Sequence, residues 1–165
     1  MSMINGLPAH PLLVHFIVVL APLTAILAIL CAVWPAARRR LVWLTLALAG
    51  VTLVLTPITA EAGEWLYNRV EDTELVEKHE HLGETMIYFS LALFAVTVLL
   101  AFVQHRANRG NNSTALSLIA AVLVIGAGVA TSAQVYRIGH SGAESVWSDA
   151  LEPAAAGGGE GGEGG

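Results

Sequence analysis

Histidine is the residue type in this sequence that is best suited to chemistry, because imidazole binds iron, copper and zinc and titrates near neutral pH. Five of the six histidines stand at the ends of long apolar segments; these five are His10, His15, His79, His81 and His140. The sixth, His105, lies in a basic segment, where we expect it to be solvated. The single cysteine, Cys31, has no partner in the chain, so histidine and glutamate are the remaining candidate ligands.

The composition predicts that membrane helices position these histidines. Hydrophobic residues make up 55% of the 165 residues and charged residues only 13%, which is too few for an ordinary soluble domain. Crossing about 30 Å of hydrocarbon takes about 20 apolar residues. Four segments qualify and contain no Asp, Glu, Lys or Arg: residues 11–34, 41–60, 85–103 and 114–135. Lipid supplies no water to backbone groups, so each must be helical, and we predict an all-α integral membrane four-helix bundle.

The distribution of charge predicts how this bundle is oriented. Two loops carry arginines and no acidic residue: residues 35–40 hold three, and residues 104–113 hold Arg106 and Arg109. All thirteen acidic residues fall outside these loops. The positive-inside rule therefore predicts that both loops face the cytoplasm and that both termini lie on the extracytoplasmic side of the cytoplasmic (plasma) membrane. The five histidines then gather on the outer side.

We expect one membrane domain over residues 1–152, followed by a disordered Gly- and Glu-rich tail over residues 153–165. The longest loop, residues 61–84, should carry short helical extensions of the second and third spans above the membrane. The net charge of −5 and the lack of a long basic run exclude the electrostatic pattern of a nucleic-acid-binding protein. The lipid bilayer is therefore the expected partner.

Helical periodicity and depth rank the histidines. His79 shares one helix face with small and weakly polar residues, whereas His81 shares the opposite face with Glu77 and Glu84. We therefore predict that His79 points inward and that His81 is solvated. His15 lies about one turn inside the first span, where an ionisable residue marks a functional site by default. A neutral, hydrogen-bonded structural histidine is an equally good interpretation of His15.

Three further residues are secondary candidates. His10 precedes Pro11 and should occupy the start of the first helix. His140 lies in a glycine-rich exit from the fourth span, and Glu64 follows the second span, where its carboxylate could join the same outer cluster. For both residues a solvated surface position is the simpler interpretation.

The segment LPAHPLLVHF at residues 7–16 resembles the opening of a family of predicted bacterial membrane proteins, domain of unknown function 2231 (DUF2231). This resemblance implies a four-helix core from Gly6 to about Trp147, with family-like positions at His79 and at the glycine-rich exit, residues 139–142. The sequence departs from the family pattern at Ile17, where proline is frequent, and at Ala143, where a second glycine is expected. The family implies a fold and no activity.

The first functional hypothesis is a cofactor or metal site at the outer helix ends. Helix bundles build such sites from side chains on facing helices, and imidazole suits haem b as well as divalent metals. The hypothesis assigns haem b to His15 and His79, with His10 or His140 as further ligands, and a divalent metal to His15, His79 and Glu64. Bound haem would imply electron transfer at the outer face.

The second hypothesis is a structural or accessory subunit that binds no cofactor. Small residues on the first span (Ala21, Ala25, Ala28 and Ala32) and on the fourth (Gly128 and Ser132) form close-packing faces, which fit either within the fold or against a membrane protein partner.

Transport has weaker support, because no charged residue lies within a span. A pH sensor is a further alternative, since clustered histidines titrate near neutral pH. No hydrolase or nucleotide-binding motif is present, so an enzyme has no positive support.

Overall fold

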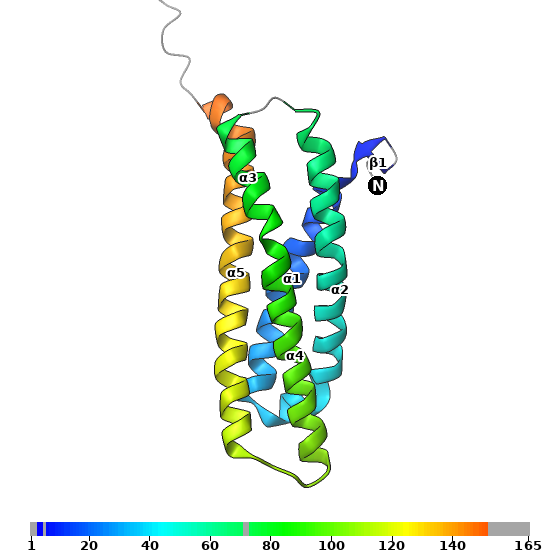
Figure 1. Cartoon of the computed structure of the whole chain (residues 1–165), viewed down its shortest axis with the longest axis vertical. Coiled ribbons are helices and arrows are strands. Elements are labelled where there is room, and N and C mark those ends of the chain that lie inside the picture. The colour runs from blue at the N-terminus through cyan, green and yellow to red at the C-terminus, as the bar shows by residue number, and fades with distance from the viewer. Residues whose placement is uncertain (1–2, 5, 71–72, 152–165) are drawn as a thin grey trace, which may run out of the picture.

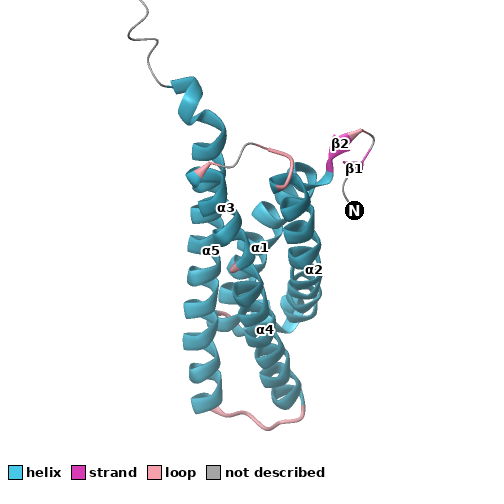
Figure 2. Ribbon diagram, turned by 45° about the horizontal axis from the view of Figure 1, so that its top comes forward, coloured by secondary structure: helices cyan, strands magenta, loops and turns pink. Residues whose placement is uncertain are grey.

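The computed structural model describes residues 3–4, 6–70 and 73–151, and in this part of the chain it is almost entirely helical (Figure 1). The elements are β1 (Met3–Ile4), β2 (Leu7–Pro8), α1 (Ala9–Val33), α2 (Pro35–Tyr67), α3 (Glu74–Glu84), α4 (Met86–Asn108) and α5 (Thr114–Leu151). The predicted tail, residues 153–165, lies outside the described residues. The strands β1 and β2 form a minimal antiparallel hairpin beside the first turn of α1 (Figure 2).

Helices α1, α2, α4 and α5 form an elongated four-helix bundle (Figure 1). Each helix packs mainly against two neighbours, in the cyclic order α1, α2, α4, α5, and α3 continues the line of α4 beyond a break at Thr85. Four helices are long and apolar enough to cross a membrane, with α3 and α4 together forming the third. The predicted all-α four-span bundle is therefore confirmed.

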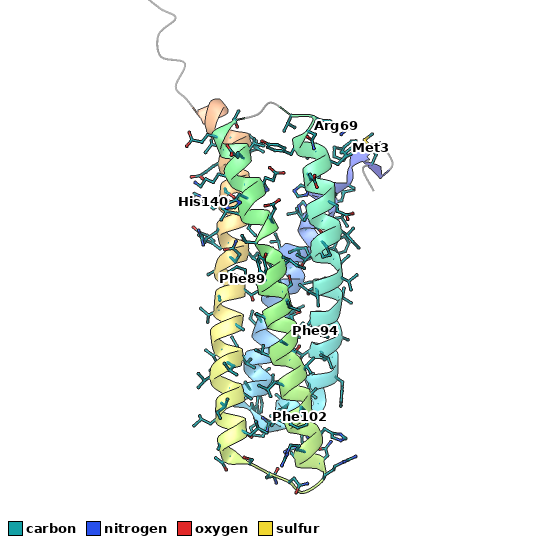
Figure 3. All side chains as sticks on the ribbon, viewed as in Figure 1. Met3, Arg69, Phe89, Phe94, Phe102 and His140 are labelled. Atoms are coloured by element: carbon teal, nitrogen blue, oxygen red, sulfur yellow. The ribbon has the colours of Figure 1, made fainter. Side chains whose placement is uncertain are left out.

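The two ends of the bundle differ in chemistry. One end, which we call the histidine end, carries the start of α1, the end of α2, α3 and the end of α5 (Figure 1). Met3, Arg69 and His140 lie there, whereas Phe102 lies near the opposite end (Figure 3). That opposite end, which we call the arginine end, carries the α1–α2 and α4–α5 connections with Arg38, Arg39, Arg40, Arg106 and Arg109.

The helices run past the predicted spans at the histidine end. Helix α2 continues to Tyr67, α5 continues to Leu151, and α3 adds three turns before α4. The two predicted extensions are thus present, and the extension of α5 is longer than its apolar segment indicated. Helix α3 contains four glutamates and a lysine in 11 residues and has no buried residue, so it stands outside the apolar segment of α4.

Small side chains let α1 and α5 approach each other closely. Ala21, Ala25 and Ala28 on α1 are completely or almost completely buried. A Cβ atom added to Gly128 on α5 would lie 3.0 Å from Cδ1 of Ile29 and 3.5 Å from Cβ of Ala25. The close-packing face predicted from the sequence is therefore used inside the fold.

Buried hydroxyl groups add polar contacts to the apolar interior. Thr52, Thr56 and Thr59 on α2 each donate to a carbonyl of their own helix four residues earlier, at 2.8 Å. Thr56 also meets Ser90 on α4, with an Oγ1–Oγ distance of 2.9 Å. In lipid such bonds satisfy groups that water cannot reach, so these hydroxyls tie α2 to α4 without charge.

Replacing Gly128 with valine tests the α1–α5 contact. The added side chain collides with Ile29, and overpacking of this kind costs about 1–3 kcal/mol. We expect Gly128→Val to lower the free energy of unfolding by this amount, measured by denaturant titration in mixed micelles. The matched control is Gly126→Val, because no atom lies within 4 Å of a Cβ added at this exposed position. Equal effects of the two substitutions would contradict the packing.

Candidate cofactor site

His10 is held at the first turn of α1 by the backbone of α2. Its Nδ1 atom lies 2.9 Å from the carbonyl oxygen of Thr59. Because a carbonyl only accepts hydrogen bonds, Nδ1 carries the proton, and in the neutral ring Nε2 keeps its lone pair. The ring lies against Gly63, where an added Cβ would be 2.9 Å from both Cε1 and Nδ1. Only glycine at this position lets the imidazole lie on α2.

His79 is held in the same way by α5. Its Nδ1 atom lies 3.1 Å from the carbonyl oxygen of Ile138 and 3.1 Å from Oγ of Ser141. Ser141 is buried and itself donates to the Ile138 carbonyl at 3.0 Å. The ring lies against Gly142, where an added Cβ would be 2.9 Å from Cε1. As in His10, Nδ1–H is the donor, and no described residue forms a hydrogen bond with Nε2 of His79.

The two histidine sites share one local pattern. In each, the imidazole donates to a helix carbonyl and lies against the glycine four residues later, Thr59 with Gly63 for His10 and Ile138 with Gly142 for His79. One turn of α-helix separates residues i and i+4, so carbonyl and glycine form a single docking face for the ring. The α1–α2 and α3–α5 pairs therefore present two equivalent imidazoles, although we found no sequence repeat.

The two rings face each other across the histidine end. Their centroids are 6.3 Å apart and their planes are inclined by 79°. A small cavity of about 70 Å³ borders both rings and is otherwise lined mainly by apolar side chains, including Ile17, Met86 and Val135.

A larger cleft of about 1150 Å³ adjoins the same two rings. Residues from α1, α2, α3, α4 and α5 line it, and its surface is mostly apolar. Its polar lining residues include His15, Glu61 and Glu64. The histidine end thus combines a fixed imidazole pair with space for a sizeable ligand.

The predicted orientation of His15 is wrong, and His10 takes its place opposite His79. The His15 side chain is exposed, and its Nδ1 atom bonds the Pro11 carbonyl of its own helix. Positions i and i+5 point about 140° apart on a helix, so only one of these two histidines can face the interior. Depth along the chain favoured His15, but His10 lies two turns before the buried Ile17 and so shares the inward face of α1.

The other candidates lie outside the imidazole pair. His79 points inward and His81 has an 81% exposed side chain, as predicted. His140 is exposed and pairs with Glu144 at 3.4 Å, and Glu64 is exposed as well. In the described part of the chain no group of three His, Cys, Asp or Glu residues could hold a metal ion, so His15, His79 and Glu64 do not come together as ligands.

Sequence reasoning missed the groups that hold the rings. The Thr59 and Ile138 carbonyls belong to the backbone, so no side-chain pattern reports them. Gly63 and Gly142 are visible in the sequence, each near the histidine end of a long helix, but their contact with an imidazole depends on helix pairing. The signal in the sequence was the i, i+4 spacing of Thr59 with Gly63 and of Ile138 with Gly142. This spacing is informative only when the histidine that packs against each pair is known.

Alanine substitution on α5 tests how His79 is docked. A Cβ at residue 142 forces the His79 ring away from Ile138, and losing a buried hydrogen bond costs about 1 kcal/mol or more. We expect Gly142→Ala to lower the unfolding free energy by that amount. Gly139→Ala is the matched control, because its Cβ meets no atom within 4 Å and alanine favours helix by up to about 1 kcal/mol. A stabilising effect of both substitutions would refute the contact.

Comparison with known proteins supplies a family and no activity. No curated protein and no solved structure matches the chain. The family described as predicted membrane protein (DUF2231) matches residues 6–155, which covers all four membrane helices and both histidine sites. This match agrees with the four membrane helices of the structure, and the chain belongs to the DUF2231 family of predicted membrane proteins.

Proposed function

We propose that this membrane protein binds haem b between His10 and His79 and serves as a one-electron carrier. The observation that carries the proposal is the pair of opposed imidazoles, each with its Nδ1 bonded to a helix carbonyl. Histidines that ligate metals almost always donate their other ring N–H to a carbonyl, a carboxylate or water, which fixes the tautomer and the ring orientation. Both rings therefore have the second hydrogen bond that a ligand histidine requires.

The spacing of the rings leaves room for one metal ion between them. Two metal–nitrogen bonds of about 2 Å and two imidazole ring radii of about 1 Å add to about 6 Å. The observed centroid separation is 6.3 Å. His10 and His79 would therefore hold a haem iron without a large change in the separation of their rings.

The number of protein ligands favours haem over a divalent metal. A zinc site takes three or four protein ligands, and no such group exists among the described residues. Haem would bring nitrogen ligands of its own, so only two protein ligands would be needed, and His10 and His79 would supply them. Two histidines without a third ligand fit this requirement.

The surroundings of the pair also suit a large, mostly apolar group. The adjoining cleft of about 1150 Å³ exceeds the volume of most cofactor sites, and its lining is mostly apolar. When bound, haem with two histidine ligands supplies reversible one-electron chemistry. The roles of the chain would then be to orient His10 and His79 and to limit the access of water.

The optical spectrum tests this proposal directly. The protein is produced in a haem-competent bacterium and purified from membranes in a mild detergent, and reduced and oxidised spectra are recorded together with haem content. We expect about one haem b per chain, with the sharp reduced bands of six-coordinate iron. Replacing either axial ligand should alter these bands, so His10→Ala and His79→Ala are each expected to lose most of the bound haem.

Two controls separate ligation from general damage. His140→Ala and His105→Ala are expected to keep the spectrum, because both side chains are exposed and neither belongs to the pair or to the cleft. Absence of haem in the wild-type protein under haem-replete conditions would contradict the proposal and leave the rings as an edge-to-face aromatic pair. A haem-free protein that copurifies with a membrane partner would favour the accessory-subunit hypothesis.

A further inference from the structure

The arginine end holds a buried charge, Arg38, one turn inside α2. Only 8% of the residue is exposed, whereas the adjacent Arg39 and Arg40 are exposed. Its Nε atom donates to Oε1 of Gln104 on α4 at 3.3 Å. Gln104 is itself buried and donates through Nε2 to Oδ1 of Asn108 at 2.6 Å, which fixes its oxygen toward Arg38.

Among the described residues, no carboxylate forms a salt bridge with Arg38. The sequence contains no Asp or Glu in residues 1–60 or in residues 85–143, and the acidic side chains that the structure describes lie at the histidine end. In this part of the chain the one side-chain hydrogen bond of Arg38 goes to a neutral amide. A buried charge is costly unless it is paired and hydrogen-bonded. An anion from another molecule would supply the missing countercharge.

The neighbourhood of Arg38 is that of a membrane interface. Trp34 and Trp43 are each 58% exposed, which is typical of side chains that anchor a helix at the headgroup level. Arg106 is exposed on the same end, with its guanidinium carbon 5.9 Å from the centre of the Phe102 ring. The arginine end thus offers a positive surface beside apolar helix faces that contact acyl chains.

We propose that Arg38 binds the phosphate group of an anionic phospholipid in the leaflet that holds the arginine end. The guanidinium fork matches two phosphate oxygens, and the Nε bond to Gln104 leaves both Nη groups for the ligand. The phosphate group of a phospholipid lies at headgroup depth, and basic pockets between membrane helices bind such headgroups. Free phosphate has the same oxygen chemistry but lacks acyl chains to contact the exposed apolar faces.

Native mass spectrometry of the purified protein tests this site with three probes. These are phosphatidylglycerol, phosphatidylcholine and inorganic phosphate. We expect the wild-type protein to retain phosphatidylglycerol over phosphatidylcholine by at least about tenfold. Arg38→Gln should abolish most of this preference, whereas the exposed matched control Arg40→Gln should change it by about twofold or less.

A second variant keeps the test decisive if Arg38→Gln does not fold. Arg38→Lys keeps the charge but loses the planar fork, and we expect it to reduce phosphatidylglycerol retention severalfold. Equal losses in the Arg38 and Arg40 variants would overturn the site in favour of general surface attraction. Inorganic phosphate that competes fully with phosphatidylglycerol, or a wild-type protein that retains both lipids equally, would overturn the lipid assignment.

Discussion

The hydrogen bond from each imidazole N–H to a main-chain carbonyl of a neighbouring helix is the interaction on which the histidine end depends. It joins α1 to α2 through His10 and Thr59, and α3 to α5 through His79 and Ile138. Each bond fixes a tautomer and a ring orientation together, because a carbonyl can only accept. Without these bonds the rings would be free to turn toward water, as His81 and His140 do.

Glycine makes this interaction compatible with close helix packing. Gly63 and Gly142 each lie one turn beyond the carbonyl that holds the ring, and a methyl group at either position would overlap the imidazole. The bundle therefore uses small residues in two ways. The buried alanines of α1 and Gly128 of α5 bring these two helices together in the apolar part of the bundle. At the histidine end, Gly63 and Gly142 each leave room for a polar ring. At the opposite end, Arg38 is buried and forms no salt bridge with any of the described acidic residues.

The sequence predicts the fold well because lipid leaves few alternatives. Four uncharged segments of about 20 residues must be helices. The two arginine-rich loops connect the first helix to the second and the third to the fourth, so these helix ends lie at the same end of the bundle. The inward direction of His79 and the exposure of His81 also follow from helical angle alone. The choice between His10 and His15 does not follow from helical angle, because it depends on which face of α1 packs against α2. The carbonyl partners and the burial of Arg38 depend on helix pairing and have no signal in a single segment.

In the proposed complex, His10 and His79 would both hold one haem iron. Electron paramagnetic resonance of the oxidised, purified protein at low temperature measures this ligation, because two imidazole ligands keep ferric iron in the low-spin state. We predict a low-spin ferric signal that is lost in His10→Ala and in His79→Ala and retained in His140→Ala. A high-spin signal in the wild-type protein, or no haem iron signal, would contradict the proposed ligation.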